Sequence, residues 1–253
     1  MAVRGGKMRI IISPAKKMNV DMDSLPCQGS PVFIEDTKVL LEKLKGMSYS
    51  QLKNLWKCND AIAQLNCERI AAANLNRSLT PAVLSYEGIQ YQYMAPSVFN
   101  DAELAYITEH LRILSGFYGI LRPFDGVIPY RLEMQAKLAT ENAPDLYGFW
   151  KDKIAKQLFS ETDCIINLAS KEYSCTVSKY LTEKTRFITC TFAQEKDGKL
   201  VEKGTVCKMA RGEMVRFMAE NNITDPDRIK SFDRQDYRYS ETHSTADNFV
   251  FVR

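Results

Sequence analysis

The sequence predicts an α+β fold, in which helices wrap a central mixed β-sheet. Apolar residues recur at helical spacing through the first half of the chain, and short runs rich in β-branched residues dominate the second half. An isoleucine-rich run at residues 8–13 predicts a buried strand, which we expect to join strands from the second half. No linker composition divides the halves, so we predict a single domain over residues 8–253, with residues 1–7 a disordered extension or an artificial addition.

Helices make up most of the structure expected in the first half. The spacing predicts helices over residues 37–44, 50–58 and 61–73, the second capped by Ser48 or Ser50. Further along, Asn100 and Glu103 have the form of a capping box. The helix that follows leads into a glycine-rich loop, and its apolar face consists of Leu104, Ile107, Leu111 and Leu114.

The second half is expected to be richer in strands. An amphipathic helix over residues 144–159 precedes strands at 163–168 and 186–193. Residues 195–199 are a strong turn signal, so residues 187–193 and 200–206 are predicted to pair as a hairpin. A helix over 208–221 and a strand over 248–252 complete the chain.

The composition is ordinary for a globular protein. Of the 253 residues, 45% are hydrophobic and 26% charged, and the net charge is only +3, so any affinity for nucleic acid must come from a local basic surface. No apolar run is long enough to span a bilayer, and we expect no membrane partner and a cytoplasmic location.

Cysteine and histidine limit the possible chemistry. The seven cysteines include no Cys-x-x-Cys pair, as expected of reduced thiols, and we expect Cys164, Cys190 and Cys207 in the core. Cys27 is the nearest candidate for a peroxide-reducing thiol, but no proline lies at the upstream position typical of such loops. The two histidines, His110 and His243, lack metal-ligand spacing, so we predict no metal and no cofactor.

The loop over residues 114–134 is the most informative segment. It combines three glycines, two prolines and two arginines with many apolar side chains. Glycine lets the backbone approach a neighbour or a ligand, and proline restricts the turn. We therefore expect Arg122 and Arg131 to emerge from a rigid base, where arginine can grip phosphate or carboxylate with two hydrogen bonds.

With three other segments, this loop resembles the YaaA family of bacterial peroxide-stress-resistance proteins. The four matching segments occur in the family's order, at residues 9–17, 114–134, 165–173 and 208–217. The resemblance implies a cytoplasmic protein that limits oxidative damage. It also implies a single-domain mixed fold with a positively charged cleft that binds DNA through a helix-hairpin-helix-like element, and no firmly assigned enzymatic reaction.

One segment departs from the family. Where the family often has Phe-Lys-Gly-Asp-Val-Tyr, residues 86–91 read Tyr-Glu-Gly-Ile-Gln-Tyr. The lysine is replaced by Glu87 and the aspartate by Ile89, so any role of those two family residues is in doubt here.

Several of these residues have a structural explanation as well as a functional one. Glu133 lies two residues after Arg131, so in an extended segment the two can form an ion pair. The turn from Gly116 to Gly119 is either the hairpin of a helix-hairpin-helix or a helix C-cap. Gly212 is costly inside a helix and predicts close approach of another segment or a ligand. The lysine pair 16–17 and the basic face of the helix from Lys208 have a solvated surface as their alternative explanation, and His110 is expected to be a helix-surface or packing residue.

Our first hypothesis is a non-enzymatic protein that binds double-stranded or structured DNA, mainly through its phosphates and with little sequence specificity. The residues expected to line its basic cleft are Lys16, Lys17, Arg112, Gly116, Gly119, Arg122, Arg131, Lys208, Arg211 and Arg216.

The alternative is an enzyme that acts on a small anionic or nucleotide-like substrate held by the same cations, with Glu133, Tyr130 or Tyr173 as acid or base. Its polar pocket residues are Ser13, Tyr130, Glu133, Asn167, Ser170 and Tyr173. An enclosed pocket favours this alternative, whereas a wide groove favours DNA. Direct iron binding is disfavoured because histidine is scarce and no Glu-x-x-His pair is present.

Overall fold

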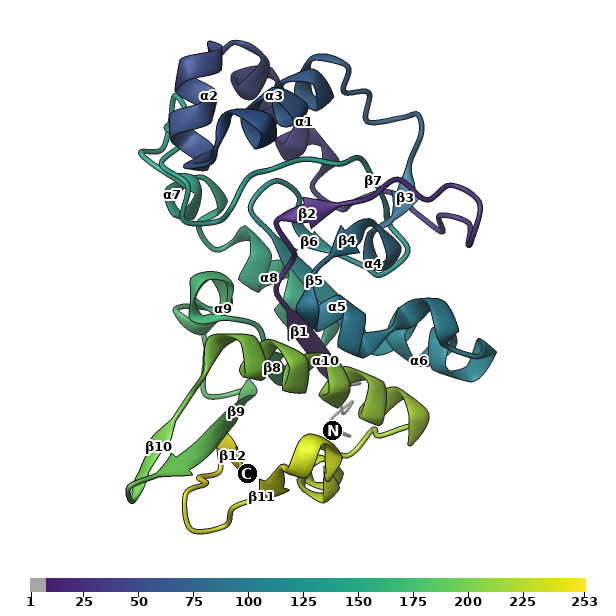
Figure 1. Cartoon of the computed structure of the whole chain (residues 1–253), viewed down its shortest axis with the longest axis vertical. Coiled ribbons are helices and arrows are strands. Elements are labelled where there is room, and N and C mark those ends of the chain that lie inside the picture. Colours follow the sequence, from purple (N-terminus) through teal and green to yellow (C-terminus); the bar gives the residue numbers. More distant parts are fainter. Residues whose placement is uncertain (1–7) are drawn as a thin grey trace.

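The computed structural model describes residues 8–253, and the expectation for residues 1–7 lies outside the described residues (Figure 1). Within this range an eight-stranded mixed sheet runs through the middle of the molecule. Its strands, in spatial order, are β11 (Arg238–Tyr239), β12 (Asn248–Val252), β9 (Arg186–Lys196), β8 (Cys164–Leu168), β1 (Arg9–Ile12), β5 (Leu111–Ser115) and β6 (Gly119–Leu121), with β10 (Lys199–Val201) paired to β9. Two small sheets pair β2 (Lys17–Met18) with β4 (Tyr86–Glu87), and β3 (Thr80–Pro81) with β7 (Gly126–Val127).

Five strands of the large sheet form a parallel core. β5, β1, β8, β9 and β12 run in the same direction, and the three shorter strands are antiparallel to their neighbours. Ile10, Ile11 and Ile12 of β1 are fully buried because helices cover both faces of the sheet. The α+β class, the mixed sheet and the pairing of β1 with strands of the second half are confirmed.

The strand order creates a crevice. The chain leaves β1 to form β5 on one side of it, and later returns to form β8 on the other side. The connections that follow β1 and β8 therefore start side by side and lead to opposite sides of the sheet. In such sheets the carboxyl ends of the two strands border a crevice where ligands bind.

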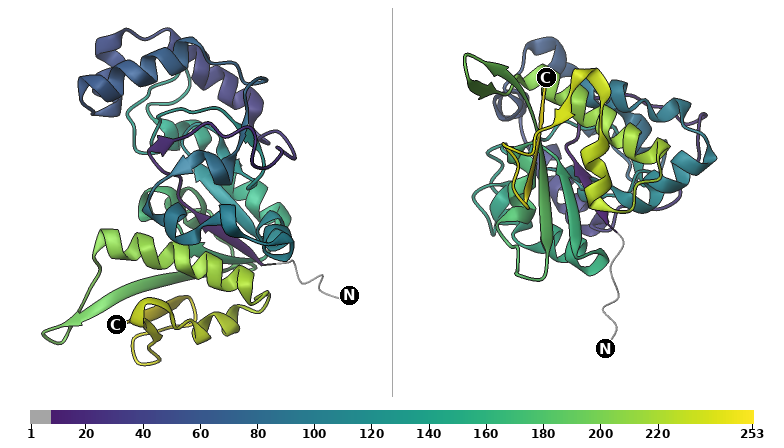
Figure 2. Two further views of the ribbon diagram at one scale, coloured as in Figure 1. Left: turned by 45° about the vertical axis from the view of Figure 1, so that its right-hand side comes forward. Right: turned by 90° about the horizontal axis from the view of Figure 1, so that it is seen from below.

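Helices cover the two faces unequally. One face carries α5 (Ile89–Met94), α6 (Asp101–His110) and α10 (Gly204–Glu220), and the other carries α8 (Lys153–Glu161) and α9 (Lys171–Ser178), as the right-hand view of Figure 2 shows. A separate group at one end of the sheet consists of α1 (Ile34–Lys45), α2 (Tyr49–Trp56) and α3 (Asp60–Ala71). The remaining short helices are α4 (Ala82–Ser85), α7 (Leu146–Trp150), η1 (Pro96–Val98), η2 (Pro226–Ser231) and η3 (Arg234–Asp236).

Local signals located most of these elements. The side chain of Ser48 accepts a hydrogen bond from Gln51 at the start of α2, and Asn100 and Glu103 cap α6 reciprocally, as the capping box predicts. The strand at residues 248–252 and the β9–β10 hairpin are also confirmed, although β10 is short because α10 already begins at Gly204.

Two helix predictions are wrong. The helix from Asn100 ends at His110, and Leu111–Ser115 is the strand β5 instead, because its consecutive buried residues lie between β1 and β6. Gly116 and Gly119 therefore lie in a β-hairpin between β5 and β6, and neither a helix-hairpin-helix nor a helix C-cap forms there. The predicted helix over 144–159 is divided into α7 and α8, because Lys151 adopts a positive φ of 45°.

No helix among residues 8–253 is both long enough and apolar enough to cross a membrane.

Candidate functional site

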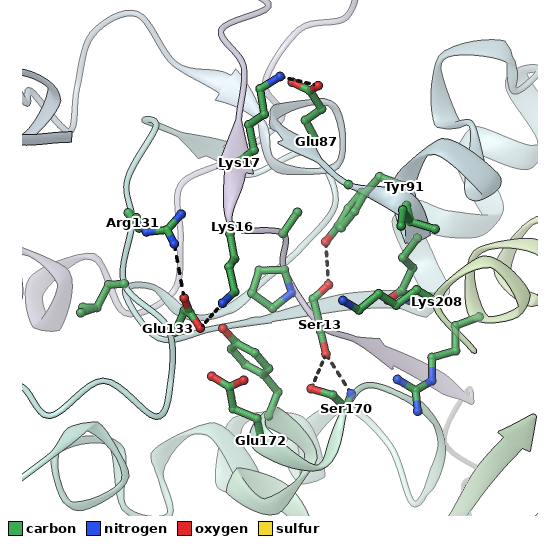
Figure 3. Close-up of a pocket in the computed structure, with 18 of the residues that line it drawn as sticks. Ser13, Lys16, Lys17, Glu87, Tyr91, Arg131, Glu133, Ser170, Glu172 and Lys208 are labelled. Carbon is green, nitrogen blue, oxygen red and sulfur yellow. Dashed lines mark hydrogen bonds and ion pairs between the residues drawn. The ribbon is translucent and has the colours of Figure 1, made fainter. Parts of the chain in front are cut away.

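A cavity of about 370 Å³ opens at the carboxyl ends of β1 and β8, in the crevice that the strand order creates (Figure 3). We call it the switch-point cavity. Its floor is formed by residues 13–17 after β1 and by Ser170, Glu172 and Tyr173 after β8. Its walls are formed by residues 87–91, by residues 130–133 and by Lys208 and Arg211 of α10.

Hydrogen bonds hold the two strand ends together. The Ser13 hydroxyl accepts the Ser170 backbone N–H at 2.9 Å and donates to the Ser170 hydroxyl at 3.2 Å. The Tyr91 hydroxyl donates to the Ser13 carbonyl at 2.9 Å. These bonds join the start of α9 to the end of β1 and to α5 at the floor of the cavity.

A close helix crossing positions the basic wall. A methyl group at Gly212 of α10 would lie 2.2 Å from the carbonyl oxygen of Gln90 in α5, so only glycine permits this contact. The close approach predicted from Gly212 is therefore confirmed, and the neighbouring segment is α5. The crossing holds Arg211 beside Gln90 at the cavity wall.

Unpartnered hydrogen-bond donors gather in this cavity. Three of the residues that line it each have a buried side-chain nitrogen with no partner among residues 8–253: Arg131 Nε, Arg211 Nε and Gln90 Nε2. A buried donor without a partner costs about 1–3 kcal/mol, so such groups call for an explanation. An anionic or acceptor-rich group on the α10 side of the cavity would offer acceptors to Arg211 and Gln90.

Two of the predicted lysines meet carboxylates at the rim. Lys16 pairs with Glu133 at 2.8 Å, and Arg131 lies 3.8 Å from the other oxygen of Glu133, so the ion pair expected from the spacing of Arg131 and Glu133 is present. Lys17 pairs with Glu87 at 2.6 Å, directly across the β2–β4 ladder. These exposed lysines are partly neutralised, whereas neither Lys208 nor Arg211 forms an ion pair within residues 8–253.

Glu172 is a candidate acid or base. It is half-buried at the start of α9, and it accepts the Gln135 backbone N–H at 3.2 Å. Burial raises the pKa of Glu172 above its ordinary value, and the nearby Glu133 carboxylate raises it further. Such a group can exchange a proton with a bound ligand.

Buried tyrosines line the switch-point cavity and pack beside it. Hydrogen bonds join the Tyr130 hydroxyl to the hydroxyls of Tyr86, at 2.8 Å, and Ser115, at 2.6 Å. Burial raises the pKa of Tyr130 to about 12 and holds that of Tyr173 well above its ordinary value. Both hydroxyls are thus fixed as neutral hydrogen-bonding groups rather than as bases.

Five of the ten predicted phosphate-binding residues line the switch-point cavity: Lys16, Lys17, Arg131, Lys208 and Arg211. Arg112 and Arg122 lie at a different hollow of about 150 Å³, where buried Arg112 pairs with Glu161 at 2.6 Å. Arg216 pairs with Glu220 at 2.8 Å on α10. The predicted single cleft therefore does not bring all ten residues together.

The two loop glycines have structural roles. A methyl group at Gly116 would lie 2.6 Å from the Leu132 carbonyl oxygen, and Gly119 combines a φ of +74° with a contact to Trp150. Neither glycine lines the switch-point cavity.

Five of the six predicted polar residues line the cavity, and Asn167 does not. Its amide bonds the backbone of Ala169 and the hydroxyl of Thr189, at 3.0 and 3.2 Å, beneath the floor. Glu87, Gln90, Tyr91 and Glu172 line the cavity but were not among the predicted site residues. Each had a sequence signal, since Glu87, Gln90 and Tyr91 belong to the segment 86–91 that aligns with the family, and Glu172 follows Ser170 and Lys171 at a strand end.

The cysteines and His110 lie elsewhere. Burial and the Asp125 charge raise the pKa of the Cys27 thiol, which is opposite to the shift that activates a thiolate. His110 is buried against Tyr106 and donates to the Met8 carbonyl at 2.7 Å, as expected of a packing residue. In the described part of the chain, no group of three or more His, Cys, Asp or Glu residues has the geometry to hold a metal ion.

Comparison with known proteins gives a consistent match. A family model described as peroxide stress protein YaaA matches residues 8–243. The chain is 55% identical over 246 residues to a UPF0246 protein of Lachnoclostridium phytofermentans, covering 97% of this chain and 96% of that protein. It is 51% identical over 246 residues to a UPF0246 protein of Pediococcus pentosaceus, covering 97% and 98%.

Proposed function

This chain belongs to the peroxide stress protein YaaA family, and we propose that it contributes to peroxide resistance in the cytoplasm by binding a small anionic ligand in the switch-point cavity. The observation that carries the proposal is the set of three buried, unpartnered donors on Arg131, Arg211 and Gln90, which line this one cavity in the described range. A phosphate or carboxylate group beside Lys208 supplies acceptors for Arg211 and Gln90.

The position and size of the cavity support the same proposal. Its volume of about 370 Å³ lies in the range of small-molecule sites, and it occupies the crevice where ligands bind in sheets of this strand order. Lys208 and Arg211 add positive charge that no carboxylate of residues 8–253 neutralises within ion-pair distance. A small phosphate-bearing molecule such as a nucleotide fits these requirements.

A second candidate function is DNA binding, because the cavity adjoins a larger hollow. Lys16 and Glu133 also line a second space of about 610 Å³, whose wall includes Lys57 and Lys137. A strand of nucleic acid lying along both spaces would place successive phosphates near Lys208 and these lysines. Such binding would be salt-dependent and weakly sequence-specific.

The test is to measure binding of inorganic phosphate and adenosine 5′-monophosphate by isothermal titration calorimetry, with wild type, Arg211→Met and Arg216→Met. Arg216 is the matched control, because it lies on the same helix and is paired with Glu220. We expect binding by the wild type, a loss of about tenfold or more in Arg211→Met, and a change within about twofold in Arg216→Met.

Fluorescence anisotropy with duplex DNA separates the two candidates. A steep loss of affinity between about 50 and 200 mM salt, reduced in Lys208→Met and Arg211→Met, would favour DNA, especially if neither small anion binds. Equal affinity of the wild type and Arg211→Met for every anion would refute both candidates.

A further inference from the structure

We infer that the ligand of the switch-point cavity is bipolar, with an anionic group held by Lys208, Arg211 and Gln90 and a hydrogen-bond-donating cationic group that faces Glu172. This inference rests on the proposed binding of a small anion and adds the second end of the molecule. It is carried by unpaired charges of opposite sign on opposite sides of one cavity (Figure 3).

The basic side is rich in hydrogen-bond donors. Lys208 and Arg211 lie three residues apart on α10 and so project from one face of the helix. Gln90 is 7% exposed, and its Nε2 finds no acceptor in the part of the chain that the structure describes. Two cations and a buried amide donor together select a group with several acceptor oxygens, such as phosphate or carboxylate.

The acidic side offers acceptors. Glu172 and Glu133 lie together across the cavity from Lys208, with Ser13 and Ser170 between the two sides (Figure 3). Glu133 is already occupied by Lys16 and Arg131. Glu172 accepts a backbone N–H but forms no ion pair with any described residue. A half-buried carboxylate of this kind is stabilised by a cation or a strong donor.

The two sides exclude simpler ligands. An anion that filled the whole cavity would bring negative charge against Glu172, which forms no ion pair with any described residue, and this is unfavourable in a half-buried space. A cationic ligand would meet the same difficulty at Lys208 and Arg211. A molecule with an anionic end and an ammonium or protonated-nitrogen end satisfies both sides. The distance between the basic and acidic sides of the cavity selects the length of that molecule.

Matched probes test this inference without knowledge of the natural ligand. The probes are ω-aminoalkyl phosphates with two to five carbons and the alkyl phosphates of the same length, titrated at pH 8. At one chain length we expect the amino compound to bind the wild type about tenfold more tightly than its partner. In Glu172→Gln we expect that preference to disappear, so that the two compounds bind about equally, while the affinity for the alkyl phosphate is retained or increased.

Two control variants separate the ends of the ligand. Arg211→Met should weaken both compounds by a similar factor and preserve the preference. Glu141→Gln removes the same charge from an exposed residue outside the cavity, and the preference should stay at the wild-type value.

The outcomes are distinct. If alkyl phosphates bind through Arg211 but the amino group adds nothing at any length, the bipolar ligand is refuted and the proposed anion site stands. If the preference survives in Glu172→Gln, the cationic end does not lie at Glu172 and the inference is also refuted. If neither series binds, the proposed function is refuted together with it.

Discussion

At the scale of single residues, the cavity holds polar groups that folding alone would not favour. Gln90 is buried with an amide nitrogen that lacks an acceptor within residues 8–253, and Arg131 and Arg211 each have a buried Nε in the same condition. The buried Tyr130 hydroxyl, by contrast, has two partners. Three of the six unpartnered buried side-chain polar atoms of residues 8–253 belong to residues that line this one cavity, which supports the proposed ligand site.

Gln90→Leu should separate stability from binding. Because it removes a buried donor without a partner, we expect the free energy of unfolding to be unchanged or raised by about 1 kcal/mol, and affinity for adenosine 5′-monophosphate to fall. Urea unfolding and calorimetry measure the two quantities. Asn66→Leu is the control, because the buried Asn66 amide donates to the Ile62 carbonyl at 2.8 Å and its loss should destabilise the protein. Clear destabilisation by Gln90→Leu would contradict the account.

Asp125 should make stability depend on pH. Burial, partly offset by the Arg122 N–H and by the charges of Arg122 and Arg112, raises its pKa from 3.8 to about 6. The unfolded chain loses this proton above about pH 4, whereas the folded chain keeps it until about pH 6. The contribution of Asp125 to the free energy of unfolding therefore decreases between these values, by on the order of 3 kcal/mol.

Asp125→Asn should abolish that decrease, because asparagine has no carboxyl group to titrate. Its amide oxygen can still accept the backbone N–H of Arg122, which donates to the Asp125 carboxylate at 2.8 Å. Denaturant unfolding at a series of pH values between 4 and 7 measures the effect. Asp247→Asn, at an exposed side chain, should retain the wild-type profile. An identical profile in wild type and Asp125→Asn would show that Asp125 does not cause the pH dependence.

At the scale of elements, local signals predicted structure wherever neighbouring residues decide it. The caps of α2 and α6 and the turn between β9 and β10 depend on residues a few positions apart. Leu111–Ser115 could not be assigned this way, because an apolar run of that length suits a buried helix or strand and its partners lie far away in the sequence. The break at Lys151 had no sequence signal, since lysine rarely adopts positive φ.

Gly212→Ala tests the crossing of α10 over α5. The new methyl group would lie 2.2 Å from the Gln90 carbonyl oxygen and 2.9 Å from the Met94 nitrogen, so the helices must separate. We expect a loss of about 1–3 kcal/mol in the free energy of unfolding and weaker anion binding, because Arg211 moves with the helix. Gly204→Ala is the control on the same helix, since nothing lies within 4 Å of its added methyl group. Equal effects of the two substitutions would contradict the role of the crossing.

At the scale of the whole molecule, the site is assembled from distant parts of the chain. Its floor follows β1 and β8, and its walls come from α5, residues 130–133 and α10. The sequence indicated the basic and polar residues but not which of them meet, because the strand order decides that. Lys208 and Arg211 line the switch-point cavity. Arg112 and Arg122, which lie at the β5–β6 hairpin, line another hollow.

Ligand binding should protect these distant segments together. With saturating adenosine 5′-monophosphate, hydrogen exchange should slow in α5, in α10 and in residues 170–174 at the start of α9, because one molecule contacts all three. The backbone amides of α3 serve as the internal control, because α3 does not line the cavity. Protection confined to α3, or to a single wall, would be inconsistent with one shared site.

The most direct measurement is a crystal structure of the protein with ethyl phosphate. We expect the phosphate group in the switch-point cavity, within hydrogen-bond distance of the side chains of Lys208, Arg211 and Gln90. A phosphate bound instead between Arg112 and Arg122, or along Lys57 and Lys137 with the switch-point cavity empty, would contradict it.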